Sequence, residues 1–219
     1  MACLPLLQQS QNWDGCVSVG QVADVLDKPG LASWMVRQAL SKAEAFLRQH
    51  SGQRLTAALI DEAVRHGLAA VGDRRRAAGE TGRQRHRLAE AVLAGEAVAD
   101  TRALRALRSW LDSLPGVSWQ ASPLLSAPSL GVAGRPDLVG CSPAGVVLGD
   151  LKTGQLRDSH RLQVGGYVVL AEALGLRLQG AYLLRLAEDG FEAHDLTAEA
   201  PVLAEAFRAA LTLYRTFRT

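Results

Sequence analysis

The feature that most constrains the fold of this chain is a change of hydrophobic period at Pro115–Gly116. Before this point apolar residues recur at helical spacing, and after it they alternate as in β-strands. The first part predicts helices over residues 33–50, 59–71, 81–94 and 101–114. The second part predicts strands over 117–125, 132–139 and 146–152, a helix over 157–174, strands over 178–186 and 191–196, and a helix over 197–218. This order predicts a mixed α/β fold with a central sheet and an N-terminal helical region.

The composition excludes several classes of protein. With 48% hydrophobic and 21% charged residues, the chain matches a globular protein and not a disordered one. No apolar run approaches the roughly 20 residues that a membrane span needs, so no membrane partner is expected. The three cysteines cannot form a disulfide framework, and none lies in a Cys-x-x-Cys pair. We therefore expect no structural zinc, no iron–sulfur cluster and a reducing cytoplasmic compartment.

The charge is small overall but uneven. The formal net charge is +2, so the whole chain is not a polycation. Residues 74–87 nevertheless hold six arginines against one acid, Glu80. Such a stretch suits phosphate groups, and it is equally typical of a solvated helix face. The six are Arg74, Arg75, Arg76, Arg83, Arg85 and Arg87.

The strand predicted over residues 146–152 ends in two charged side chains. Because strand side chains alternate between faces, Asp150 and Lys152 share one face. Taken alone, Asp-x-Lys is typical of an exposed ion pair. Lys152 is, however, one of only three lysines among 24 basic residues. Its compact ammonium, which shifts its pKa more readily than guanidinium, therefore suggests a role that arginine would not fill.

A second carboxylate is expected beside this strand end. The break at residues 141–145 predicts a hairpin between the strands at 132–139 and 146–152, which brings Asp137 near Asp150. Two neighbouring carboxylates repel unless a cation joins them, and such oxygen-rich sites hold Mg²⁺ or Mn²⁺. A lysine beside the ion, here Lys152, can orient or deprotonate a water and stabilise charge that grows on phosphorus.

Four motifs in order resemble the PD-(D/E)XK nuclease superfamily, and most closely its RecB/Cas4-like exonuclease branch. They are Gly82-Arg83-Gln84-Arg85-His86, Gly134-Arg135-Pro136-Asp137, Gly149-Asp150-Leu151-Lys152-Thr153-Gly154 and Gln163-Val164-Gly165-Gly166-Tyr167. The resemblance implies a single nuclease domain over residues 1–219. Within it, a restriction-endonuclease-like core over 80–219, with a mixed central sheet flanked by helices, follows a helical elaboration over 1–79.

The resemblance also implies roles for single residues. The metal ligands would be His86, Asp137, Asp150 and the backbone carbonyl of Leu151. Lys152 would activate the water, while Gln163 and Tyr167, one helical turn apart, would support the site and hold the substrate backbone. Glu90, one turn after His86, is either a supporting partner or a surface acid. The implied catalytic residues are Lys152, Asp150, Asp137, Gln163 and Tyr167, and the implied nucleic-acid contacts are Arg74, Arg75, Arg76, Arg83, Arg85 and Tyr167.

Two departures from the family pattern are visible. The stretch 119–123 lacks the acid that many members carry there, so no fourth side-chain ligand is expected. Scattered cysteines also cannot bind the iron–sulfur cluster that Cas4-type enzymes contain.

The expected function is a metal-dependent nuclease that acts as an exonuclease on DNA ends or single strands. The near-neutral net charge favours a local groove over a wide duplex-binding surface. The basic excess lies in residues 1–114, with 15 basic and 12 acidic residues. Two alternatives remain: a structure- or sequence-specific endonuclease on the same core, and a non-catalytic nucleic-acid-binding or assembly subunit. A helicase or annealing protein is a possible partner.

Overall fold

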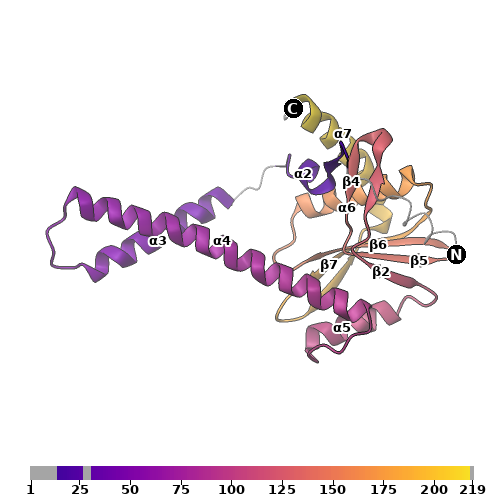
Figure 1. Cartoon of the computed structure of the whole chain (residues 1–219), viewed down its shortest axis with the longest axis horizontal. Helices are drawn as coiled ribbons and strands as arrows, with labels where there is room; N and C mark the ends of the chain where they lie inside the picture. Colours follow the sequence, from indigo (N-terminus) through magenta and orange to yellow (C-terminus); the bar gives the residue numbers. More distant parts are fainter. Residues whose placement is uncertain (1–13, 27–30, 218–219) are drawn as a thin grey trace. The chain divides into compact units, whose positions relative to one another are not determined.

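The structure is a computed structural model that describes residues 14–26 and 31–217. The chain divides into two compact units (Figure 1). The larger unit comprises the chain up to Leu26 and residues 84–219, and the smaller unit comprises residues 27–83. None of the helices in the described ranges is both long and apolar enough to cross a membrane.

A mixed five-stranded sheet forms the centre of the larger unit. Its strand order is β2–β5–β6–β7–β8, in which β6 and β7 run parallel and the other neighbours antiparallel. The strands are β2 (Ser118–Ala121), β5 (Leu138–Ser142), β6 (Gly145–Lys152), β7 (Leu178–Leu186) and β8 (Phe191–Asp195). The predicted hairpin between β5 and β6 is confirmed by their antiparallel register, and so is the mixed α/β fold with a sheet flanked by helices.

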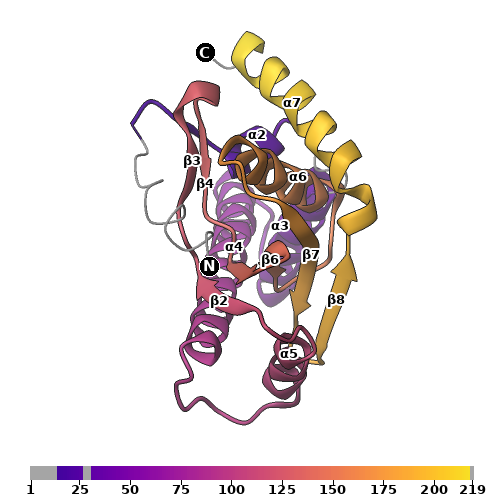
Figure 2. The same cartoon turned by 90° about the vertical axis from the view of Figure 1, so that its right-hand side faces the viewer.

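Helices cover both faces of this sheet (Figure 2). On one face lie α2 (Val19–Ala23), α6 (Asp158–Ala173) and α7 (Ala200–Phe217), the last preceded by the short helix η2 (Thr197–Glu199). On the other lie α5 (Arg102–Asp112) and the last turns of α4 (Ala57–Leu93).

Two glycines of α6 allow its close packing. A Cβ at Gly165 would lie 2.3 Å from the Leu203 carbonyl oxygen, and one at Gly166 would lie 2.5 Å from Val19. Any larger residue would push α6 away from α7 and α2. These glycines therefore help to set the position of the motif residues on the same helix.

Two predicted strands are divided in the structure. The prediction over 132–139 becomes β4 (Val132–Gly134) and β5, which belong to different sheets. Pro136 lies at the break, and it lacks the N–H that a continuous ladder needs. The prediction over 117–125 likewise becomes β2 and β3 (Leu125–Ala127), separated by Ser122, whose φ of 45° is left-handed, and by Pro123. β4 lies between β3 and β1 (Val17–Ser18) in a second sheet, with the turn η1 (Pro128–Leu130) after β3.

The smaller unit is built from α3 (Leu31–Gln49) and residues 57–83 of α4. The prediction of separate helices over 59–71 and 81–94 is wrong, because α4 is continuous. No proline lies between them, and glycines weaken a helix without ending it. The two helices pack closely where a Cβ at Gly67 would lie 2.5 Å from the Ala39 carbonyl oxygen.

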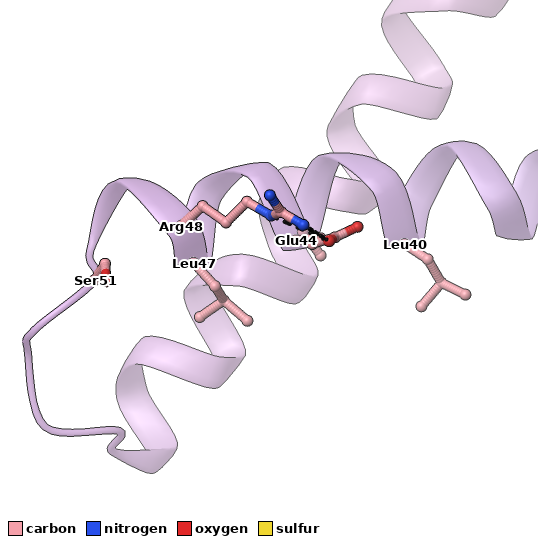
Figure 3. A pocket seen from close by; sticks show the side chains of 6 residues that line it. Leu40, Glu44, Leu47, Arg48 and Ser51 are labelled. Carbon is pink, nitrogen blue, oxygen red and sulfur yellow. Dashed lines mark hydrogen bonds and ion pairs between the residues drawn. The ribbon is translucent and has the colours of Figure 1, made fainter.

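One side of α3 carries an open groove lined by small, apolar and charged residues (Figure 3). Glu44 and Arg48 form an ion pair at 2.6 Å along it. Leu40 remains 64% exposed, so this apolar side chain is not covered within its own unit. The lining residues are Leu40, Ala43, Glu44, Leu47, Arg48 and Ser51.

Of the cysteines that the structure describes, Cys16 is a free thiol and Cys141 is disulfide-bonded. A count of three excludes a framework of several disulfides but not a single one. The cysteine count was therefore a weak guide to the compartment.

Candidate active site

The β5–β6 hairpin brings the two motif aspartates to one end of the sheet. Asp137 directly precedes β5, and Leu138 pairs with Gly149, the residue before Asp150. The Leu151 N–H donates to Asp137 Oδ2 at 2.6 Å. This bond fixes the orientation of the Asp137 carboxylate against the backbone of β6.

His86 meets the same carboxylate from α4. Its Nδ1 lies 2.8 Å from Asp137 Oδ1. The hydrogen bond to Asp137 raises the pKa of His86 above its ordinary value, and partial burial opposes that rise. Residues 51 positions apart in the chain thus share one contact, which no local pattern specifies.

Asp150 is buried and its charge is only partly compensated. Its side chain is 1% exposed, and Lys152 Nζ lies 2.5 Å from its Oδ2. This oxygen is buried, and the Lys152 ammonium is its close charged partner. Burial raises the pKa of Asp150 to about 6, against the attraction of Lys152 and with added repulsion from Asp137.

The donor set has the chemistry of a site for an oxygen-preferring divalent ion. Two carboxylates lie at one strand end, and that of Asp150 is buried beside an ammonium. Carboxylate and carbonyl oxygens are the ligands that Mg²⁺ and Mn²⁺ prefer. In the described parts of the chain, no three His, Cys, Asp or Glu side chains stand ready as a metal-binding group. His86 Nδ1 and both Asp137 oxygens are already engaged with protein groups, and an ion would replace such contacts.

The helix α6 supplies Gln163 and Tyr167 one turn apart. Gln163 Nε2 donates to the Tyr167 hydroxyl at 2.8 Å, and that hydroxyl donates to the Arg135 carbonyl oxygen at 3.1 Å. Tyr167 is 3% exposed, and burial raises its pKa well above the ordinary value. A Cβ at Gly134 would lie 2.9 Å from its ring. Tyr167 thus supports the backbone of the segment that leads into Asp137.

The arginines of the predicted nucleic-acid surface fall into two groups. Arg74, Arg75, Arg76 and Arg83 belong to the smaller unit and are exposed. Arg76 pairs with Asp73, and Arg83 pairs with Glu80 at 2.6 Å. Arg85 belongs to the larger unit, where its side chain is only 20% exposed and points to backbone carbonyl groups.

Sequence reasoning missed one contact at the site. The Ser122 hydroxyl donates to Glu90 Oε1 at 2.6 Å, and the Ser122 N–H donates to the Asp137 carbonyl oxygen at 2.9 Å. Glu90 is therefore bonded to Ser122, and its role as a supporting partner of His86 stays a prediction. Pro123 signals a break in the strand, but nothing in the local pattern indicated that Ser122 would meet α4.

A sequence model described as the PD-(D/E)XK nuclease superfamily matches residues 36–216. Among solved structures, "Crystal structure of SSO0001" is similar over 95% of this chain and 86% of that chain, at 13% identity and a TM-score of 0.36. Comparison with curated proteins finds no significant match.

Proposed function

The chain belongs to the PD-(D/E)XK nuclease superfamily, and on that premise we propose that it is an Mg²⁺- or Mn²⁺-dependent DNA exonuclease. The observation that carries the proposal is the buried Asp150, paired with Lys152 and placed beside Asp137. A structural ion pair gains little from such burial, because desolvation offsets its Coulombic attraction. A site that binds a divalent ion and holds an ammonium next to it would make use of this arrangement.

The residues that would hold the ion are Asp137, Asp150, the Leu151 carbonyl and His86. When bound, a divalent ion polarises the phosphate and lowers the pKa of a coordinated water. Asp137 is oriented for this task by the Leu151 N–H. His86 is presented by α4 and already contacts the Asp137 carboxylate.

Lys152 would act on the attacking water and on the phosphate. Its side chain is 19% exposed, so the ammonium is held by Asp150 yet open to a substrate. A fixed positive charge in a partly desolvated site stabilises the negative charge that develops on the phosphate oxygens. Asp150 thus has two tasks, as a ligand and as the partner that positions Lys152.

Gln163 and Tyr167 would support the reaction by holding the substrate-binding segment in place. The chain of two hydrogen bonds from Gln163 through Tyr167 to the Arg135 carbonyl leaves little freedom to the backbone before Asp137. Because Tyr167 is buried, we assign it this supporting role and propose Gln163 as the member of the pair nearer to substrate.

The choice of exonuclease rests on the motif set of the RecB/Cas4-like branch and on the charge distribution. A net charge of +2 favours a local groove for a strand end. An endonuclease on the same core is the second candidate. The presence of Asp137, Asp150 and Lys152 together argues against a subunit without catalytic activity.

The test uses purified protein with Mn²⁺ on linear and on closed circular single-stranded DNA. We expect the linear strands to shorten and the closed circles to remain intact. Equal cutting of circles would reject exonuclease action and favour the endonuclease. Labels at the 5′ or the 3′ end of single and double strands then define the polarity and the substrate.

The matched variants are Asp150→Ala and Lys152→Ala, with Arg105→Gln as the control. Arg105 is an exposed arginine of α5 that pairs with Asp100. We expect the two site variants to lose activity and the control to keep it, with all three folded by circular dichroism. Normal cleavage by both site variants would show that the site is assigned wrongly.

A further inference from the structure

Two polar contacts tie the His86 turn of α4 to the sheet, one on each side of the histidine. Arg85 directly precedes His86, and Glu90 follows it by one helical turn. Both side chains bond to groups far away in the sequence, and both of these groups lie next to motif residues. The apolar residues of this turn, such as Ala89 and Val92, pack on the sheet but carry no directional bond.

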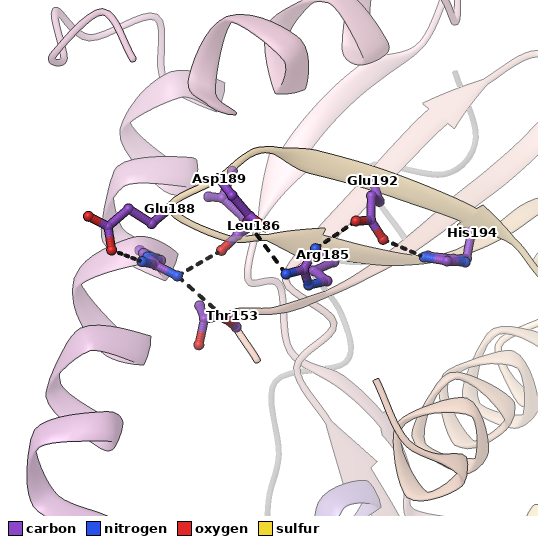
Figure 4. Close-up of polar contacts among 8 residues, drawn as sticks. Thr153, Arg185, Leu186, Glu188, Asp189, Glu192 and His194 are labelled. Carbon is purple, nitrogen blue, oxygen red and sulfur yellow. Dashed lines mark hydrogen bonds and ion pairs between the residues drawn. The ribbon is translucent and has the colours of Figure 1, made fainter. Parts of the chain in front are cut away.

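Arg85 reaches the turn that follows Lys152. Its Nη1 donates to the carbonyl oxygens of Thr153 and Leu186, each at 3.4 Å. Figure 4 shows Thr153 and Leu186 side by side, with Glu188 nearby. Glu188, which is 97% exposed, lies 3.9 Å from the same guanidinium and adds little. One guanidinium therefore connects α4 with the exit of β6 and with the end of β7. A planar group with several donors can bridge two carbonyls, which an ammonium does less well.

Glu90 reaches the opposite flank of the site. Its Oε1 accepts the Ser122 hydroxyl at 2.6 Å. Ser122 in turn donates its N–H to the Asp137 carbonyl and accepts Arg135 Nη1 at its own carbonyl at 3.1 Å. The left-handed φ of 45° at Ser122 is uncommon for serine and is held by these bonds. Glu90 therefore connects α4 with the segment that carries Asp137.

We propose that Arg85 and Glu90 are positioning residues, which lock the helical turn of His86 against the Lys152 turn and the Asp137 segment. The proposal rests on the proposed function, in which His86 helps to hold the ion. Residues 85, 86 and 90 occupy adjacent faces of one helix, so the two contacts resist both rotation and sliding of α4. In this proposal Arg85 binds backbone carbonyl groups and not DNA phosphates, unlike the other arginines predicted to contact nucleic acid.

The experiment compares Arg85→Gln and Glu90→Ala with the wild type, with Arg105→Gln as the control for loss of an arginine charge. The first measurement is hydrogen exchange of the backbone amides over residues 84–93, without metal or DNA. The second is Mn²⁺ affinity by calorimetry without DNA. The third is steady-state kinetics of DNA cleavage, which gives kcat and KM separately.

We expect faster exchange in both variants and unchanged exchange in the control. Mn²⁺ affinity and kcat should fall by about 10- to 100-fold, the usual effect of losing a group that orients a ligand, while KM stays constant. Arg85→Lys keeps a hydrogen-bond donor, and Glu90→Gln keeps an acceptor. Each should therefore retain part of the Mn²⁺ affinity that Arg85→Gln or Glu90→Ala loses.

A double-mutant cycle tests the second contact directly. Ser122→Gly removes the hydroxyl and tolerates the positive φ, so its effect on Mn²⁺ affinity should not add to that of Glu90→Ala. Additive effects would overturn the proposed link between these two residues.

Other outcomes would also overturn the proposal. Arg85→Gln could instead raise KM and reduce the salt dependence of DNA binding by about one phosphate contact, with hydrogen exchange and kcat unchanged. That result would mean that Arg85 binds DNA. Unchanged exchange and unchanged Mn²⁺ affinity in both variants would reject positioning altogether. If the wild type hydrolyses no DNA but exchange and Mn²⁺ affinity change as expected, the proposed function fails and the positioning stands.

Discussion

Two regions of the molecule use charge in opposite ways. At the end of β6, Asp150 and Lys152 are largely withdrawn from solvent and depend on each other. In the smaller unit, Arg74, Arg75 and their neighbours are exposed, and Arg76 and Arg83 pair with acids on the same helix. The effect of a buried charge depends on its exact location, because few other groups can replace it. Exposed charges are screened by solvent and salt, so they contribute mainly through the combined potential of several residues. The two regions should therefore differ in how they respond to single substitutions.

The largest expected effect belongs to Lys152. We expect Lys152→Ala to lower kcat by roughly 10²–10³, the usual effect of removing one preorganised electrostatic group, with little change in KM. Lys152→Arg keeps the charge but is bulkier and cannot lose its proton, so it should not restore full activity. Steady-state kinetics with Mn²⁺ provides the measurement. Full rescue by arginine would mean that the site needs only a positive charge.

The pH dependence of stability gives a second, intermediate effect. The pKa of Asp150 is raised to about 6 from an ordinary 3.8, so the folded state holds its proton more tightly than the unfolded state does. The resulting stabilisation is present below pH 3.8 and is lost as the pH rises through about 6. In EDTA at pH 8, Asp150→Asn should raise Tm by several degrees. For a chain of this size, each kcal/mol of added unfolding free energy raises Tm by about 2–4 °C.

Thermal unfolding at pH 3.5 and pH 8 checks this sign. The gain from Asp150→Asn should shrink at the lower pH, where the wild-type carboxyl is protonated in both states. Mn²⁺ should raise Tm of the wild type more than that of the variant. A variant that is less stable than the wild type at pH 8 would show that the Lys152 ion pair outweighs the burial of charge.

The smallest effects are expected in the exposed arginines. Within residues 14–26 and 31–217, Arg74 and Arg75 form no ion pair, whereas Arg76 and Arg83 pair with acidic neighbours. If the stretch binds DNA, Arg74→Gln and Arg75→Gln should each raise KM a few-fold and reduce the salt slope by about 0.7–0.9. Arg76→Gln should change binding less. Binding measured at several salt concentrations decides this, and no change in slope would leave the stretch as a solvated helix face.

The sequence predicted elements that have local signals better than elements whose limits depend on tertiary packing. The Asp-x-Lys strand and its hairpin follow from alternation and a turn signal, which are local properties, and the structure has both. The helix over 59–71 and the helix over 81–94 were separated wrongly, since periodicity weakens at the glycines without any residue that ends a helix. The strand over 132–139 was predicted as one because its apolar pattern continues through Pro136, although the two halves enter different sheets.

The sequence by itself determined which residue types lie at the end of β6 and the order of helices and strands around them. The tertiary structure alone decided that Asp150 is buried beside Lys152, and that Arg85 faces carbonyl groups. It also joined Ser122 to Glu90 across 32 residues. Burial and long-range hydrogen bonds depend on which elements pack together. The hydrophobic period is a property of residues close together in the sequence, so it does not show which elements will pack.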